Sequence, residues 1–263
     1  MGVALSDGTV KIYYEVHGSG PAIALVHGSG GHHAAWWQQV AALRDRYTLV
    51  TIDLRGFGNS DSSMPEFDGQ DFPGDVVAVL DAANLTDVLV FGQSIGAVAA
   101  LRAGLARPDR ISGVALGHSL GGIAHPELTP LVAADRAEAV KLPVIDRLLS
   151  REFQEKEAAK TFLFQQQGTF NVAKMADLRN LTVGGPTLDE VVASGLEVTF
   201  LAGEKDAVIS PATVRRAHEL LKGSHVELIP DAPHSMYWER PDLFNAALVR
   251  IRERLSAKKA KHP

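Results

Sequence analysis

Cysteine is absent from the 263 residues of the chain. This absence excludes disulfide bonds, thiolate catalysis, zinc sites with cysteine ligands and iron–sulfur clusters together. It suits a reducing compartment, and we expect a cytoplasmic protein. No apolar run reaches the roughly 18 residues that a membrane-spanning helix needs. The first residues also lack a basic segment followed by an apolar stretch, so we expect no secretory signal.

An excess of basic residues is also missing. The formal net charge is −5 at pH 7, which gives no reason to expect a nucleic acid as partner. Hydrophobic residues make up 46% of the chain, which is ordinary for a globular protein. The length fits one large α/β domain, or one domain with an insertion. We therefore expect a monomer or homodimer whose partner is a small-molecule substrate, not a nucleic acid or a membrane.

The stretch from Val88 to Ala106 predicts a strand, a sharp turn and a helix in direct succession. Val88 to Phe91 is apolar and partly β-branched, as in a buried parallel strand, and Ala97 to Ala106 is rich in good helix formers. Between them stands Gly92-Gln93-Ser94-Ile95-Gly96, the nucleophile-elbow pattern. Its glycines omit side chains that would clash in such a turn. Ser94 is therefore predicted at the tip as a nucleophile, at a helix start that favours negative charge.

A second Gly-x-Ser-x-Gly pattern occurs at residues 117–121, with Ser119 at its centre. The preceding residues could form a strand, but Gly121, Gly122 and Pro126 favour a loop and not a helix. Only Ser94 has the full strand–turn–helix context. We interpret Ser119 as a loop serine that could still line a pocket.

Strands alternate with helices through most of the chain, which predicts a mostly parallel sheet with helices on both faces. A hairpin is expected across residues 3–16, and apolar runs predict buried strands at 22–26, 47–52, 88–91, 196–202 and 226–229. Helical patterns cover residues 36–44, 73–83, 97–106, 213–221 and 241–255. Polar loops follow the strands, at the edge where open parallel sheets bind ligands.

Between residues 119 and 188 this alternation stops. Helical patterns cover residues 127–141, 145–167 and 172–181, and no convincing strand occurs. We therefore divide the chain into a core domain of residues 1–118 and 189–263 and a helical cap of residues 119–188. Large apolar cap residues such as Phe162 and Phe164 either pack its helices or roof a substrate pocket.

A serine nucleophile needs a base, and the base needs an orienting acid. His234 has the best setting among the ten histidines, because it lies in the loop after the last predicted strand and imidazole titrates near working pH. Asp206 follows an earlier strand and is the favoured acid, with Glu204 as the weaker rival. The order Ser94, Asp206, His234 is the order expected of this triad on an α/β scaffold.

Taken together, these motifs resemble the α/β-hydrolase fold family, in its branch of small single-chain serine esterases and lactonases with a helical cap. The matching stretches are His27 to Gly30, Asp53 to Ser60, Gly92 to Gly96, Gly203 to Asp206 and Ala232 to Ser235. The resemblance implies the α/β-hydrolase fold and a Ser94–His234–Asp206 triad. It also implies an oxyanion hole made by the backbone N–H groups of Ser29 and Ile95.

The resemblance predicts an enzyme that cleaves a small to medium, mostly apolar carboxylic ester or lactone through an acyl-enzyme. Family members that act on haloalkanes or epoxides carry an aspartate where Ser94 stands, which disfavours both activities, whereas cofactor-free haloperoxidases use the same triad. Two further alternatives share it: slow-turnover ligand receptors, and hydrolases that cleave a carbon–carbon bond in meta-cleavage diketo acids. The last would use cap arginines such as Arg136, Arg151 or Arg179 for the substrate carboxylate.

The roles of other residues near these loops rest on less specific sequence signals. Substrate contact is predicted for Trp36, Phe162, Phe164 and Val208, with core packing as the alternative for the aromatic residues. His27 is interpreted as a turn residue, and Asp53 and Arg55 as braces between loops. His32 and His33 are adjacent, but neighbouring side chains rarely converge and no third ligand is suggested, so we expect no metal and no cofactor.

Overall fold

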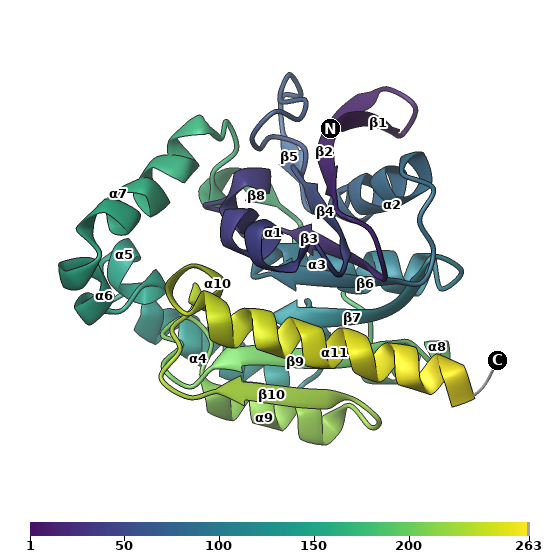
Figure 1. Ribbon diagram of the computed structural model, residues 1–263. Coiled ribbons are helices and arrows are strands. Elements are labelled where there is room, and N and C mark those ends of the chain that lie inside the picture. The colour runs from purple at the N-terminus through teal and green to yellow at the C-terminus, as the bar shows by residue number, and fades with distance from the viewer. Residues whose placement is uncertain (262–263) are drawn as a thin grey trace.

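An eight-stranded sheet forms the centre of the computed structural model, which describes residues 1–261 (Figure 1). In spatial order its strands are β1 (Gly2–Ser6), β2 (Val10–His17), β4 (Thr48–Ile52), β3 (Ala22–Val26), β6 (Val88–Gln93), β7 (Ile111–Gly117), β9 (Glu197–Gly203) and β10 (His225–Ile229). β2 pairs antiparallel with β1 and β4, and the other neighbours pair in parallel. The predicted mostly parallel sheet is confirmed.

Helices cover both faces of this sheet (Figure 1). The helices of the core are α1 (Trp37–Leu43), α2 (Phe72–Ala82), α3 (Ile95–Ala106), α8 (Leu188–Ser194), α9 (Pro211–Leu220), α10 (Met236–Glu239) and α11 (Pro241–Lys261). The last helix runs beyond its expected end near residue 255. Within the described residues 1–261, no helix combines the length and apolar character needed to cross a membrane.

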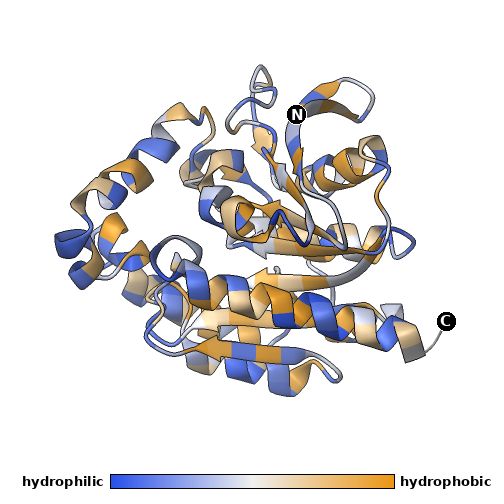
Figure 2. Cartoon of the chain, in the orientation of Figure 1, coloured by the Kyte–Doolittle hydropathy of each residue, from blue (hydrophilic) through white to orange (hydrophobic). Residues whose placement is uncertain are grey.

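Strand alternation divides the core between the two faces. All five residues of β3 are buried, and successive side chains of a strand point to opposite faces. Ile23 and Leu25 pack in the core that includes α1 and α11, whereas Ala24 and Val26 pack in the core that includes α2, α3 and α9. Figure 2 shows the resulting hydrophobic strands between helices of mixed polarity. This double burial explains why the strands read as continuous apolar runs.

The segment from residue 119 to 188 contains four α-helices: α4 (Leu128–Ala139), α5 (Val144–Leu148), α6 (Arg151–Lys156) and α7 (Ala158–Gln167). Figure 1 shows α5, α6 and α7 beyond the arrowheads of the parallel strands. The helix expected over residues 145–167 is divided into three, with one break at Glu157 and one at Ser150. Its backbone N–H and hydroxyl both donate to the Glu239 carboxylate, so a contact with the core ends α5 there.

The prediction of a helix over residues 172–181 is wrong. The segment instead contains a short turn of 3₁₀ helix and the strand β8 (Leu178–Arg179), which pairs in parallel with β5 (Phe67–Asp68). The Asn171 side chain accepts a hydrogen bond from Gly58 N–H and donates one to the Gly31 carbonyl, both at 3.0 Å, and Ala173 N–H donates to the Gly56 carbonyl. These bonds to core loops override the local helical pattern.

Candidate active site

The order of the strands creates a switch point between β3 and β6. From β3 the chain passes to β4 on one side and later returns to β6 on the other. Open α/β sheets bind ligands beyond the carboxyl ends of the strands at such a point. The residues that follow β3 and β6 are the glycine-rich loop at His27 and the turn at Ser94.

Ser94 occupies the turn between β6 and α3 in a strained backbone conformation. Its φ of 53° lies in the region that non-glycine residues rarely adopt. A Cβ atom on Gly92 would lie 2.2 Å from the Gly96 carbonyl oxygen, and one on Gly96 would lie 2.6 Å from the carbonyl oxygen of His27. Both approaches require glycine, so the predicted strand–turn–helix geometry is confirmed.

The glycine-rich loop after β3 packs against this turn. Val26 pairs with Gly92, so β3 and β6 end at the same level. A Cβ atom on Gly28 would lie 3.5 Å from the Ser94 Cβ. The partly exposed Ser29 follows Gly28, and the buried Ile95 is the first residue of α3. The structure therefore brings the loop that carries Ser29 and the start of α3 together at Ser94.

Asp206 and His234, which lie on the loops after β9 and β10, form a buried pair. The His234 Nδ1 lies 3.0 and 3.1 Å from the two oxygens of Asp206. The N–H groups of Val208 and Ile209 donate to Asp206 Oδ1 at 2.7 and 3.2 Å. Burial alone would raise the carboxyl pKa, but His234 and a further imidazole described below hold the pKa of Asp206 well below its usual range.

A second histidine contacts the same carboxylate. His118 Nδ1 lies 2.8 Å from Asp206 Oδ2, and its ring centroid lies 5.1 Å from that of His234. The sequence places His118 only in the second Gly-x-Ser-x-Gly pattern and does not predict this contact. The signal that would have found it is its position directly after β7, since the other polar site residues also follow strands.

The second Gly-x-Ser-x-Gly pattern begins no helix, as its glycines predicted. Ser119 lies in a bend, and its hydroxyl accepts the Gly121 N–H at 3.2 Å. Gly121 and Gly122 both have positive φ, at 66° and 75°. Ser119 therefore lacks the strand–turn–helix setting that Ser94 has.

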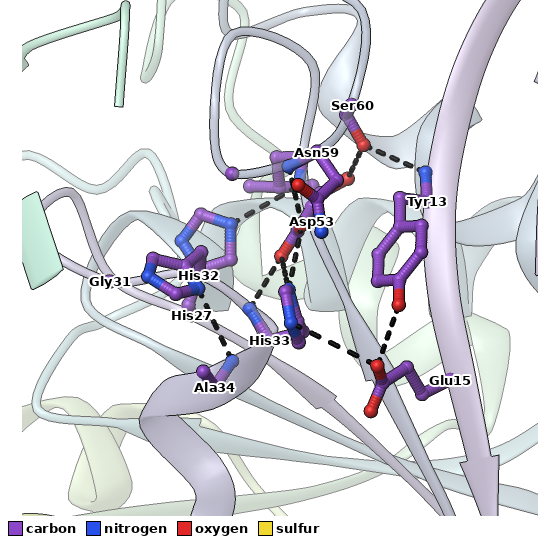
Figure 3. A network of polar contacts seen from close by, with 12 residues as sticks. Tyr13, Glu15, His27, Gly31, His32, His33, Ala34, Asp53, Asn59 and Ser60 are labelled. Atoms are coloured by element: carbon purple, nitrogen blue, oxygen red, sulfur yellow. Dashed lines mark hydrogen bonds and ion pairs between the residues drawn. The ribbon is translucent and has the colours of Figure 1, made fainter. Parts of the chain in front are cut away.

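Asp53 braces the glycine-rich loop (Figure 3). Its carboxylate accepts hydrogen bonds from the His33 backbone N–H, the His33 Nδ1 at 2.9 Å and the Asn59 N–H at 2.8 Å. Burial opposes ionisation, but these donors lower the pKa of Asp53, and the same carboxylate raises the pKa of His33 against its own burial. The bracing role assigned to Asp53 matches these contacts.

The sequence suggested no third metal ligand beside His32 and His33, and the structure corrects that point. Asp53 lies with them in a group whose ligand atoms are within 4.8 Å of one another. His118, Asp206 and His234 form a second such group among the described residues. In both groups the carboxylate is already hydrogen-bonded to imidazole and backbone N–H donors, so we explain both as hydrogen-bonded networks.

The residues predicted to contact substrate lie in different environments. Trp36 is wholly buried among the rings of Phe91, Tyr237 and Phe244. It offers no surface to a substrate and is a core residue, so this prediction needs correction. Phe164 packs on Trp238 with ring centroids 5.5 Å apart, and Phe162 is 59% exposed. Val208 is partly buried beside Asp206.

Comparison with known proteins identifies the family. A model described as the alpha/beta hydrolase fold matches residues 21–241. The chain belongs to this family. This alpha/beta hydrolase is 24% identical to a putative non-heme chloroperoxidase of Synechocystis over 94% of its own length and 96% of that protein.

Solved structures agree with the family assignment. A thermophilic esterase from Thermogutta terrifontis superposes with a TM-score of 0.80 at 21% identity, covering 96% of this alpha/beta hydrolase and 97% of the esterase. Est816, described as an N-acyl homoserine lactone degrading enzyme, superposes with a TM-score of 0.75 at 25% identity, covering 94% and 98% of the two chains. The fold predicted from the motifs is thus confirmed.

Proposed function

We propose that this alpha/beta hydrolase is a serine hydrolase that cleaves a small to medium, mostly apolar carboxylic ester or lactone through an acyl-enzyme. One observation carries the proposal: a serine in a left-handed turn at the switch point of the sheet shares that edge with a buried, hydrogen-bonded Asp206–His234 pair. Serine, histidine and carboxylate at such a site are the parts that acyl transfer requires.

In the proposed reaction, Ser94 Oγ attacks the substrate carbonyl carbon and His234 Nε2 accepts the hydroxyl proton. Asp206 remains ionised and holds His234 through Nδ1–H. The backbone N–H groups of Ser29 and Ile95 stabilise the negative oxygen of the tetrahedral intermediate, aided by the positive end of α3. His234 then protonates the departing alcohol as the carbon–oxygen bond breaks and the acyl group stays on Ser94.

Deacylation repeats these steps with water. His234 removes a proton from a water molecule, the hydroxide attacks the acyl carbon, and Ser94 leaves with the proton returned by His234. The products are a carboxylic acid and an alcohol, joined in one molecule when the substrate is a lactone. The reaction needs no metal ligand and no redox partner.

We further propose that residues 119–188 act as a cap over this edge. The support is the position of α5, α6 and α7 beyond the strand ends and the packing of Phe164 on Trp238 of α10 (Figure 1). Phe162, Phe164 and Val208 are the proposed substrate contacts. The resemblance to an esterase and to a lactone-degrading enzyme supports this substrate class.

The cap arginines argue against the carbon–carbon bond hydrolase. Arg151 pairs with Asp146 and Arg179 pairs with Glu66, and both guanidinium side chains are largely exposed. Arg136 is exposed as well. A substrate carboxylate would have to displace these partners at the surface, which supports the neutral ester or lactone.

A substrate panel tests the proposal. Short and medium p-nitrophenyl esters, two lactones of different ring size and one meta-cleavage product are assayed with the wild type and with Ser94→Ala. We expect turnover of esters or lactones that Ser94→Ala abolishes. Turnover of the meta-cleavage product alone, or ester hydrolysis that persists in Ser94→Ala, would overturn the assignment.

A further inference from the structure

We propose that His118 is a positioning residue, which fixes the Asp206 carboxylate in the orientation that aligns His234. The inference rests on the proposed function, because His118 gains this role only if Asp206 and His234 act as acid and base. It also assigns a role to His118 within the second Gly-x-Ser-x-Gly pattern, whose serine begins no helix.

Apart from His234, which contacts both oxygens of Asp206, each oxygen is held by a different kind of donor. The backbone N–H groups of Val208 and Ile209 both bind Oδ1. His118 binds Oδ2 at 2.8 Å, on the opposite side of the carboxylate. With Oδ1 alone anchored, the carboxylate could pivot and change the angle at which it meets His234 Nδ1. A second anchor on Oδ2 removes that freedom.

The backbone of His118 ties the same parts together. Its N–H donates to the Leu201 carbonyl of β9, the strand that leads to Asp206, at 2.8 Å. The carbonyl of the preceding Gly117 accepts the Ser94 N–H, also at 2.8 Å. His118 therefore stands between the nucleophile turn and the strand of the acid, and its ring packs edge-on against that of His234.

The conformation of His118 is unfavourable unless the contact with Asp206 compensates for it. Its φ of 54° is left-handed. Its imidazole is wholly buried, and Nε2 has no hydrogen-bond partner. Burial lowers the pKa of His118 even though Asp206 opposes this, which favours the neutral ring. A neutral ring that donates from Nδ1 to a carboxylate has Nε2 as an acceptor, so no buried N–H donor is left unpaired there.

Kinetics with matched variants test the role. His118→Asn retains a side-chain N–H donor and tolerates a left-handed φ, whereas His118→Ala removes the donor. We expect His118→Ala to lower kcat by on the order of 10²-fold with KM little changed, because misplaced catalytic groups lose rate and not binding. His118→Asn should restore most of the rate, and the neighbouring Ser119→Ala should match the wild type. If His118→Ala does not fold, His118→Gly, which also tolerates this φ, replaces it.

Proton NMR detects the contacts of His118 and His234 with Asp206 independently of turnover. The wild type should show two downfield imidazole N–H resonances, from His118 and His234 bound to one carboxylate. Asp206→Asn should shift both, and His118→Asn should remove one and keep the other. A single resonance in the wild type, or full kcat in His118→Ala, would overturn the inference. Hydrolysis that persists in Ser94→Ala would instead overturn the proposed function, and the two failures are thereby distinguished.

Discussion

The side-chain amide of Gln93 donates a hydrogen bond to the backbone carbonyl of His234 at 2.9 Å. Gln93 directly precedes Ser94, so this buried contact joins the turn of the proposed nucleophile to the loop of the proposed base. Gln93→Leu leaves the carbonyl unpaired and should lower the free energy of unfolding by about 1–3 kcal/mol. It should also lower kcat, because the two loops lose a direct link.

A second buried glutamine supplies the control for that experiment. Gln39 donates to the carbonyl of Tyr237 at 3.0 Å and to the Asn245 side chain at 3.2 Å, so its bonds reach the chain segment of His234 but not the Ser94 turn. Gln39→Leu should lose similar stability in urea unfolding while kcat stays close to that of the wild type. Equal kcat losses in the two variants would show that general destabilisation, and not loop alignment, is responsible.

Asp206→Asn tests the acid of the proposed triad. The amide of Asn has one acceptor oxygen, whereas the Asp206 carboxylate has two. When that oxygen accepts the backbone N–H groups, the NH2 group faces His234 Nδ1 and holds the imidazole in the wrong tautomer. We expect kcat to fall by roughly 10³ to 10⁴, with native circular dichroism retained. Glu204→Gln is the control and should keep its activity, because Glu204 is exposed. More than a tenth of wild-type kcat in Asp206→Asn would assign the acid elsewhere.

Covalent labelling separates the two Gly-x-Ser-x-Gly patterns. A fluorophosphonate reacts with a hydroxyl that has a base and N–H donors for the phosphoryl oxygen. Peptide mass mapping should place the adduct on Ser94 alone, because Ser119 begins no helix. Ser94→Ala should abolish labelling and Ser119→Ala should leave it unchanged. An adduct on Ser119 would contradict the assignment.

The buried ring of His27 should make the free energy of unfolding depend on pH. Its Nδ1 contacts the Gly28 carbonyl at 2.8 Å and its Nε2 accepts the Leu54 N–H at 3.1 Å, so the folded state requires the neutral ring. Burial lowers the pKa of His27 from 6.5 to about 4. Between these values the unfolded chain binds the proton and the folded chain does not, so the free energy of unfolding falls as pH falls, by at most about 3 kcal/mol.

Urea unfolding at pH 7, 5.5 and 4 measures this loss, and His27→Gln isolates it from other titrating groups. The variant should be less stable at pH 7, because two hydrogen bonds change, but its stability should depend less on pH. Parallel curves for the wild type and His27→Gln would show that His27 does not contribute to acid destabilisation.

The sequence predicted the frame of the molecule because local patterns specify it. Apolar runs predicted β3, β4, β6, β9 and β10 and allowed β7, but they missed the short parallel pair of β5 and β8. The spacing of Gly92, Ser94 and Gly96 predicted the strained turn. The pairing of Asp206 with His234 followed from their positions after strands, since carboxyl ends of parallel strands meet at one edge.

Contacts between distant segments set the limits of that prediction. Nothing local to His118 shows that Asp206 lies beside it. The extended path after Asn171 depends on carbonyl and N–H groups of loops more than a hundred residues earlier. Trp36 follows a site loop in sequence, but its side chain points into the core, which only its packing on the rings of Phe91, Tyr237 and Phe244 reveals.

The bonds of Asn171 and Ala173 to the loops at Gly31, Gly58 and Gly56 also define what a protein engineer can exchange. Residues 128–167 make up the helical part of the insertion and offer a natural unit for grafting from a relative with another specificity. Residues 171–179 belong with the scaffold. Their removal would leave the Gly31 carbonyl, the Gly56 carbonyl and the Gly58 N–H without these partners. A chimaera joined near Gly168 keeps those partners, whereas one joined near Leu188 discards them.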